Sequence, residues 1–235
     1  MKKLSVLLVN VGITVGISGL GCLISQPALA LTIANGGFEV PSVAPGSFQN
    51  FNAGDDIGGW TAIGTTVSLV EKNYSELAFN GVSSFVPQEG NNSLDLTGPF
   101  NQGTSNGVQQ QISTVLGQAY RLSFFVGVAS GNSRNNYSVP SIVDVSIDGN
   151  PQGSFTNSAL VPGTVNWQKF FLDFTASDAN TTLTFLNGID SSNNNFVGLD
   201  NVQIEAVPTP APLLGLLGMG IAAIRKRKQE PEIEA

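Results

Sequence analysis

The side chains that could carry out chemistry in this chain are nearly all carboxylates. Its 235 residues include 17 Asp and Glu, 10 Lys and Arg, and no histidine. Without histidine, Ser–His catalysis, Cys–His catalysis and histidine-bound zinc are excluded. The single cysteine, Cys22, lies in an N-terminal apolar segment that we expect to be removed, so no disulfide is expected in the mature protein.

Catalysis would therefore have to use paired acids. Hydrolysis of a glycosidic bond needs two carboxyl groups about 5 to 10 Å apart. The sequence offers many such pairs and marks none of them: the candidates are Asp95, Asp144, Asp148, Asp173 and Asp200. Because acids on the polar faces of strands are usually solvated, we expect a non-catalytic binding protein, with a small glycan-active enzyme as a remaining alternative.

The charge distribution separates the two ends from the middle. Six of the basic residues lie at the ends: Lys2, Lys3, Arg225, Lys226, Arg227 and Lys228. Residues 31–207 keep four basic and fourteen acidic side chains, a net charge of −10. Phosphate binding needs clustered Lys and Arg, so this charge excludes nucleic acid and an anionic membrane surface as partners of the middle part.

Residues 1–30 have the features of a secretory signal peptide. A short basic start precedes an apolar stretch, which ends in the small residues Ala28 and Ala30. Such a pattern predicts export and cleavage by signal peptidase after Ala30, and an uncleaved membrane anchor is the alternative.

The C-terminal end repeats the combination of apolar run and basic residues. Pro208, Pro210 and Pro212 form a stiff spacer before the apolar residues 213–224. As a helix this run would be about 18 Å long, which is short for a bilayer core of about 30 Å. The basic cluster that follows would stay in the cytoplasm. We therefore expect a temporary inner-membrane anchor, followed by an acidic tail at 229–235.

This order of motifs resembles the PEP-CTERM sorting signal of bacterial envelope proteins. The residues that carry the resemblance are Pro208, Thr209, Pro210 and Ala211, followed by the apolar run and Arg225, Lys226, Arg227 and Lys228. The resemblance implies removal of segment 207–228 by an exosortase, a membrane transpeptidase, and release to the cell surface or extracellular matrix. Thr209 stands where the family has Glu, and an ordinary tail anchor is the alternative.

The middle of the chain alternates apolar and polar residues in strand-length stretches. In 141–148, for example, Val143, Val145 and Ile147 share one face. Strands are expected at 65–70, 82–86, 93–96, 107–113, 120–129, 141–148, 167–176, 181–187 and 197–206, with turn signals between them. No amphipathic helical stretch is evident, so residues 31–206 are predicted to form one all-β domain, an antiparallel β-sandwich of the jelly-roll type.

The succession of these segments is similar to the galactose-binding-like jelly rolls. "NGGFEVP" at 35–41 and "GGW" at 58–60 come first, and "GLDNVQIEAV" at 198–207 comes last. This group includes many carbohydrate-binding modules. The resemblance implies that Glu39 and Asp200 lie close together and hold a structural calcium ion with nearby backbone carbonyls. Alternatively, Glu39 bonds backbone amides and Asp200 is an acid of a turn or strand edge.

A sugar site needs an exposed aromatic ring beside hydrogen-bonding groups. The segment "GNSRNNYS" at 131–138 offers Arg134, Asn136 and Tyr137, although such a segment can also be an ordinary polar loop. Trp60 and Trp167 are expected at core positions. We therefore expect a module that binds envelope or matrix polysaccharide, and a structural or adhesive matrix component without a sugar site is the alternative.

Overall fold

The computed structural model describes residues 32–78, 81–100, 103–129, 137–190 and 195–208. The predicted signal peptide and nearly all of the predicted sorting segment lie outside these ranges. The strands are β1(Phe48–Asn52), β2(Asp56–Ile57), β3(Trp60–Ile63), β4(Thr66–Glu71), β5(Ser75–Ala78), β6(Gly81–Ser84), β7(Asn92–Asp95), β8(Gly107–Ser113), β9(Ala119–Ala129), β10(Ser141–Ile147), β11(Asn150–Asn157), β12(Val165–Thr175), β13(Asn180–Asn187) and β14(Val197–Ala206). Within the described ranges the helical structure is one 3-10 turn, η1(Gly98–Phe100).

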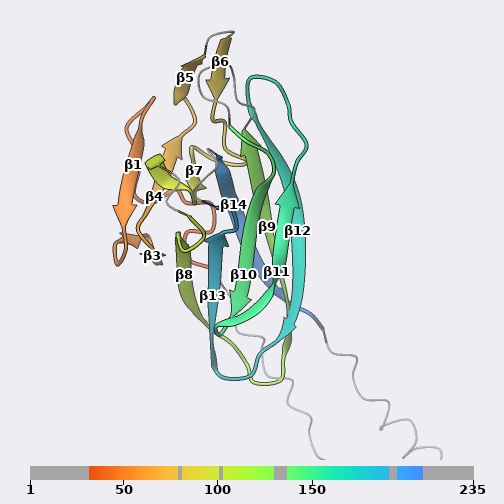
Figure 1. Cartoon of the computed structure of the whole chain (residues 1–235). Helices are drawn as coiled ribbons and strands as arrows, with labels where there is room; N and C mark the ends of the chain where they lie inside the picture. The colour runs from red at the N-terminus through yellow and green to blue at the C-terminus, as the bar shows by residue number, and fades with distance from the viewer. Residues whose placement is uncertain (1–31, 79–80, 101–102, 130–136, 191–194, 209–235) are drawn as a thin grey trace, which may run out of the picture.

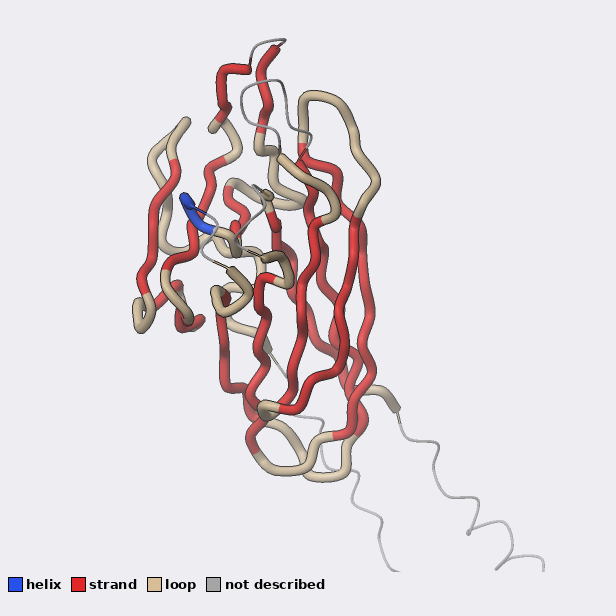
Figure 2. Tube along the Cα trace, in the orientation of Figure 1, coloured by secondary structure: helices blue, strands red, loops and turns tan. Residues whose placement is uncertain are grey.

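The strands form two antiparallel sheets that lie face to face (Figures 1 and 2). Sheet A has the order β1-β4-β7-β14-β9-β12, and sheet B has the order β11-β10-β13-β8-β3-β2. A separate hairpin, β5-β6, stands at one end of the sandwich (Figure 1). The prediction of an all-β antiparallel sandwich is confirmed.

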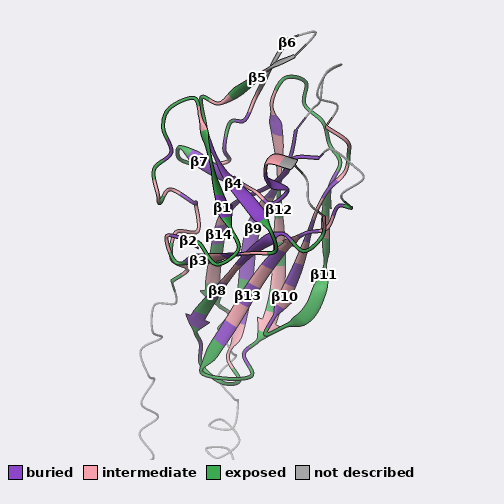
Figure 3. Ribbon diagram, turned by 60° about the vertical axis from the view of Figure 1, so that its left-hand side comes forward, coloured by how far each residue is buried: buried purple, intermediate pink, exposed green. Residues whose placement is uncertain are grey.

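The alternation of apolar residues creates the core between the two sheets. Leu122, Phe124 and Val126 of β9 and Leu183 and Phe185 of β13 are all buried in one cluster. Figure 3 shows the same alternation of buried and exposed positions along the strands. Burial of apolar area is the main stabilising term in a sandwich of this kind.

The strands that the sequence pattern did not reveal are short or exposed. They are β1, β2, β3, β5 and β11. In β11 nearly every residue is exposed, and Pro151 and Gly153 interrupt the sequence, so no period of two is visible. A two-residue turn joins β10 to β11, and its residues Asp148 and Gly149 have φ values of 51° and 76°. Aspartate and glycine tolerate this left-handed conformation, which suits a tight hairpin.

Sheet A carries a second apolar cluster on its outer face, away from sheet B. Its buried members are Val70, Phe85, Ala129, Val165 and Phe196. Trp60 is fully buried in the main core, as expected. Trp167, also expected at a core position, is partly buried and packs against this second cluster and not in the main core. Its side chain lies on the outer face because odd-numbered residues of β12 point away from sheet B.

The described chain begins and ends at the same end of the sandwich (Figure 1). Thr32 lies in a hollow with Val115 and Tyr120, and the amide of Val207 donates to the carbonyl of Ala119. The β5-β6 hairpin stands at the opposite end (Figure 1).

Candidate functional site

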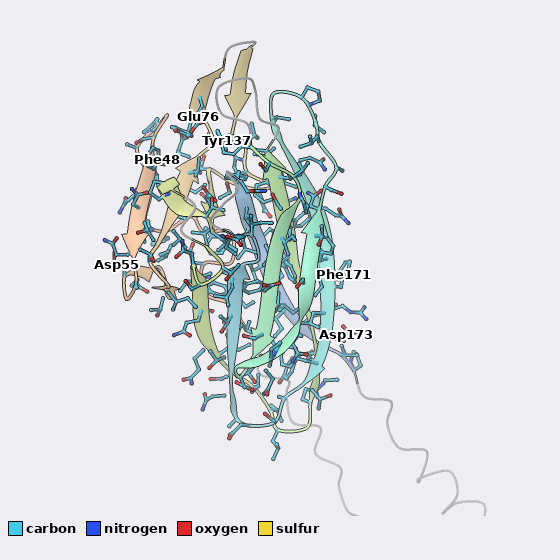
Figure 4. The ribbon with its side chains drawn as sticks, viewed as in Figure 1. Phe48, Asp55, Glu76, Tyr137, Phe171 and Asp173 are labelled. Atoms are coloured by element: carbon cyan, nitrogen blue, oxygen red, sulfur yellow. The ribbon has the colours of Figure 1, made fainter. Side chains whose placement is uncertain are left out.

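A cavity that contains two carboxylates lies on the outer face of sheet A, near the β5-β6 hairpin. Its volume is about 120 Å³. This is slightly smaller than a cavity of about 150 Å³ that can hold benzene. It is lined by Phe48, Ser68, Val70, Tyr74, Glu76, Phe85, Asp95, Gly98, Pro99, Tyr137, Asn195 and Phe196. Figure 4 shows Phe48, Glu76 and Tyr137 around this end of the molecule.

The pleat of strand β7 places Asp95 in the cavity. Leu94 and Leu96 on either side are buried in the core between the sheets, so Asp95 points to the outer face. Its cross-strand neighbours are Ser68 of β4 and Gly198 of β14. Because the glycine has no side chain, the rings of Trp167 and Phe196 can lie over it on this face.

Glu76 joins the hairpin to the cavity through two phenol groups. The hydroxyl of Tyr74 donates to Glu76 Oε1 at 3.0 Å, and that of Tyr137 donates to Oε2 at 2.8 Å. Burial and the neighbouring Glu76 raise the pKa of Tyr74 to about 12, and the same causes raise the pKa of Tyr137 further. Both phenols therefore stay protonated and act as donors at neutral pH.

Asp95 is an acid that keeps its proton unusually well. Burial raises its pKa to about 7, and the negative charge of Glu76 acts in the same direction. Hydrogen bonds to Oδ1 from Thr97 Oγ1 at 2.6 Å, from the Thr97 amide and from the Val197 amide oppose this increase. Asp95 is thus poised between its neutral and charged forms near neutral pH.

Some polar atoms of the cavity wall have hydrogen-bond partners within the protein, and others have none. Ser68 donates to Asn50, and the side-chain amide of Asn195 donates to the carbonyls of Ser138 and Pro140. By contrast, Asn195 Oδ1 is buried without a hydrogen bond, and Asp95 Oδ2 has no partner in the described part of the chain. A ligand that supplies a donor could satisfy Asp95 Oδ2, whereas the buried Asn195 Oδ1 is a costly unpaired acceptor in the wall.

Aromatic rings surround these polar groups. Tyr74 packs against Phe48 and Phe85 with ring centroids 5.3 and 5.4 Å apart. Phe85 in turn packs against Tyr137 at 5.8 Å and Phe196 at 5.1 Å. Contacts of this kind fix the rings in place, so the apolar part of the wall is largely preformed.

Glu39 and Asp200, the predicted calcium ligands, hold the same segment of chain. Glu39 accepts the amides of Asn91 and Asn92 at 2.8 and 3.0 Å. Asp200 accepts the amides of Gln88 and Glu89 at 2.8 and 3.3 Å. Segment 88–92 is therefore fastened at both ends by carboxylates, and an open hollow of about 340 Å³ adjoins it.

The fit of this pair to a calcium ion can be judged from its oxygens. Each carboxylate oxygen of Glu39 and Asp200 already accepts an N–H group. No group of three or more acids that could hold a metal occurs among the described residues. Burial raises the pKa of Asp200 to about 7, and the charge of Glu39 adds to the effect. A cation would offset this repulsion, so calcium binding stays a prediction, with backbone carbonyls as the further ligands required.

The other predicted site residues are spread over the molecule. Asp144 accepts the Ser154 hydroxyl on sheet B, and Asp173 pairs with Arg121 on sheet A at 2.7 Å. Asp148 accepts the amide of Thr182 at 2.7 Å in the turn between β10 and β11. Tyr137 is in the cavity wall. Arg134, Asn136 and the residues from Thr209 onward lie outside the described residues.

Glu76, Asn195 and Phe85 were not predicted as site residues. Their neighbours in the cavity wall come from strands far apart in the sequence, and a sequence pattern does not show which outer faces meet. For Asp95 a signal was available, since an acid between two core leucines in a central strand lies on a face that a further layer can cover.

A larger hollow of about 590 Å³ lies at the end where the described chain begins. Among the described residues of its lining, Tyr120 is the single aromatic ring and none is a carboxylate. The hydroxyl of Tyr120 accepts the amide of Val115. Its chemistry is therefore less specific than that of the acid-bearing cavity.

Comparison with known proteins gives the family and several solved structures to which this chain is similar. Similar solved structures include a CBM22-1 xylan-binding domain from Paenibacillus barcinonensis Xyn10C, with 16% identity, a TM-score of 0.42 and coverage of 72% of this chain and 100% of that one. A family 4 carbohydrate-binding module has 16% identity, a TM-score of 0.37 and coverage of 75% and 100%. An arabinose-bound α-L-arabinofuranosidase, MgGH51, has 16% identity, a TM-score of 0.44 and coverage of 75% and 26%.

The family of the chain is identified by a comparison of its sequence with protein families. Residues 29–205 match the HpiC1-like family, which is described as HpiC1 cyclase, and the chain belongs to this family. No curated protein sequence matches the chain significantly. Among the residues that the structure describes, no helix is long and apolar enough to cross a membrane.

Proposed function

We propose that the domain is a non-catalytic saccharide-binding module and that its acid-bearing cavity holds one sugar unit of an envelope or matrix polysaccharide. The observation that carries this proposal is the pairing of fixed aromatic rings with the Asp95 carboxyl group, whose Oδ2 has no hydrogen-bond partner in the described part of the chain. A sugar ring offers apolar C–H faces to aromatic rings and hydroxyl donors to such an oxygen.

Two exposed phenylalanines allow a matched test. Phe48 lines the cavity and is 40% exposed, whereas Phe171 is 58% exposed on the outer face of β12, away from the cavity (Figure 4). A polysaccharide array with the purified protein identifies a ligand, and titration then measures its affinity. We expect Phe48→Leu to weaken binding about threefold to tenfold, because a ring contact contributes roughly 0.5–1.5 kcal/mol. Phe171→Leu should leave the affinity unchanged.

The opposite result would show that the sugar binds at a different place on the molecule. Weaker binding in Phe171→Leu with normal binding in Phe48→Leu would place the sugar on the outer face of β12. Binding to no saccharide at all would overturn the proposal and favour a structural or adhesive role in the matrix.

We further propose that the protein is exported and sorted to the cell surface. The sequence motifs at its two ends support this: Ala28 and Ala30 before the domain, and Pro208 to Ala211 with the basic cluster after it. Signal peptidase and an exosortase-like transpeptidase would be the processing partners. Mass spectrometry of the secreted protein should show a chain that begins at Leu31 and lacks Arg225 to Lys228. An intact C-terminal tail on the secreted form would contradict the sorting step.

A second candidate function is acid catalysis, for which Asp95 is the specific observation. An acid with a pKa of about 7 can donate a proton at neutral pH. The description of the family, HpiC1 cyclase, names an enzyme. A binding module returns its ligand unchanged. Mass spectrometry of the ligand recovered after incubation therefore separates the two functions. A product that forms with the native protein and not with Asp95→Asn would favour the enzyme.

A further inference from the structure

The acid-bearing cavity is walled by aromatic rings that meet at steep angles. Phe48 and Tyr74 are inclined at 74° to each other, with ring centroids 5.3 Å apart. Phe85 is inclined at 79° to Tyr137 and at 63° to Phe196, with centroids 5.8 and 5.1 Å apart. Rings in this arrangement do not stack on one another but surround a compact space. The negatively polarised faces of aromatic rings attract cations, and cages of such rings bind ammonium groups.

The charged groups of the cavity have one sign. Asp95 and Glu76 are acids, and no lysine or arginine occurs among the described residues of the lining. The negative charge of Glu76 opposes ionisation of Asp95, because two like charges repel each other in a partly apolar site. An anionic ligand would add to this repulsion, and a neutral ligand would leave it in place. A cation would relieve it, so the charge of the described lining favours a positively charged ligand.

The two acids would contribute to cation binding in different ways. Both oxygens of Glu76 accept phenol hydroxyls, from Tyr74 at 3.0 Å and from Tyr137 at 2.8 Å. Donation to a carboxylate increases the electron density of a phenol ring, which strengthens the attraction of that ring for a cation. The hydrogen bonds to Asp95 are made to Oδ1, and Oδ2 has no partner in the described part of the chain. Asp95 Oδ2 can therefore accept a charge-assisted hydrogen bond from an ammonium N–H group.

We propose that the acid-bearing cavity binds an ammonium group and that its saccharide ligand is an amino sugar with a free amino group. This inference rests on the proposed saccharide binding, whose ligand class it specifies. The ammonium group would lie between the ring walls and donate to Asp95 Oδ2. Phe48 lines the cavity and is exposed, so the remainder of the sugar would lie against this ring at the opening. N-acetylation of the amino group removes its charge and should abolish the preference.

Three oligosaccharides with the same linkage separate the inference from the function on which it rests. They are oligomers of glucosamine, N-acetylglucosamine and glucose, and titration calorimetry measures their binding to the purified protein. We expect the glucosamine oligomer to bind about tenfold or more tightly than the other two, because it alone carries positive charge. Equal binding of all three would overturn the amino-sugar inference and leave the saccharide-binding function intact. Binding of none of them would overturn both.

A matched pair of variants separates the cavity from the overall charge, since a negatively charged domain attracts any polycation. Asp95→Asn removes one charge from the cavity and keeps a carbonyl oxygen that can accept the hydrogen bonds from Thr97. Asp173→Asn removes an equal charge from the outer face of β12, away from the cavity residues (Figure 4).

We expect Asp95→Asn to weaken binding of the glucosamine oligomer about tenfold or more. Asp173→Asn should bind it within about twofold of the native protein, because an exposed charge contributes little. Circular dichroism controls for folding. Equal losses in the two variants would show non-specific attraction and would overturn the proposal.

Tetramethylammonium tests the cage without a sugar, because this ion keeps its charge at every pH. It favours ionised Asp95, whose pKa is raised to about 7, so its affinity should rise with pH up to about 7 and then level off. The other titratable groups of the described lining are Glu76, Tyr74 and Tyr137, and both phenols stay protonated in this range. Glu76 is also present in Asp95→Asn, so the difference between the two pH profiles reports on Asp95. A native protein that does not bind this ion, or that binds it with the pH profile of Asp95→Asn, would overturn the proposal.

Discussion

At the scale of single residues, the surroundings decide what an aspartate can do. Asp173 is exposed and paired with Arg121, which holds the pKa of its carboxyl group below the usual value. Asp95 is enclosed by apolar rings near Glu76, and burial raises its pKa to about 7. The first residue is a fixed negative charge at neutral pH. The second is a carboxyl group that a ligand or a change of pH can ionise.

The raised pKa of Asp95 predicts a pH-dependent stability. Below its unfolded value of 3.8 both states hold the proton, and above about 7 neither does. Between these values only the folded state keeps the proton, so the free energy of unfolding falls as pH rises. The decrease is at most about 4 kcal/mol, at 1.36 kcal/mol for each pH unit. Asp200, whose pKa is also raised to about 7, acts in the same direction.

Urea unfolding at several pH values between these limits measures this slope. Asp95→Asn removes the titrating group and should flatten the slope, whereas Asp55→Asn, in an exposed turn, should not. An equal slope in the native protein and in Asp95→Asn would show that Asp95 ionises in the folded state at its ordinary pKa.

The candidate site shows how far residue-level prediction from the sequence can reach. Tyr137 was predicted as a ligand-binding residue because it combines a ring with polar neighbours, and it lies in the cavity wall. Asp95 was considered only as one of five equivalent acids. What distinguishes it is its neighbours across the sheet, Ser68 and Gly198, and the hairpin that carries Glu76. These contacts join residues far apart in the chain, which no local pattern encodes.

At the scale of elements, long strands with one buried face could be predicted, whereas most strands that were missed are short or exposed. Strands β8 and β14 have the predicted bounds, because alternation over seven to ten residues is a clear signal. Strands β2 and β3 have two and four residues, which is too few for a period of two to stand out. Their pairing depends on strand β8, far along the sequence.

Segment 88–92 is the element on which the calcium prediction can be tested. Calcium added to the purified protein should raise the melting temperature, and a chelator should lower it, because a ligand that binds only the folded state stabilises it. Glu39→Gln should abolish the difference, and Glu205→Gln, on the exposed part of β14, should retain it. If chelation leaves the native melting temperature unchanged and metal analysis finds no calcium, segment 88–92 is held by its amide bonds alone.

Packing of Trp167 gives a second prediction at this scale. Its ring lies over Gly127 and Gly198, where an added Cβ atom would approach the ring within 2.7 Å. The indole N–H also donates to the carbonyl of Val86 at 2.9 Å. Gly127→Ala should therefore destabilise the fold by about 1–3 kcal/mol through overpacking. Gly117→Ala is not a clean control because Gly117 has a positive φ, so Ser177→Ala in an exposed turn is preferable.

Denaturant midpoints of the two variants provide the measurement. A native-like midpoint for Gly127→Ala would mean that the ring of Trp167 can shift outward at little cost, and that the outer face is less rigid than its contacts suggest.

At the scale of the whole molecule, composition and periodicity were sufficient for the fold class. Turn residues between alternating stretches predicted antiparallel strands, and the lack of helical periodicity predicted two sheets face to face. The order of strands within each sheet could not be predicted, because strands far apart in the sequence, such as β14 and β7, are neighbours in one sheet. The cavity depends on that order.

The shared position of the chain ends gives the molecule two unlike poles. The described chain enters and leaves at one pole, and the acid-bearing cavity lies toward the other (Figures 1 and 4). A tether attached at either chain end would therefore hold the domain by one pole and leave the cavity at the other pole open to the surrounding medium.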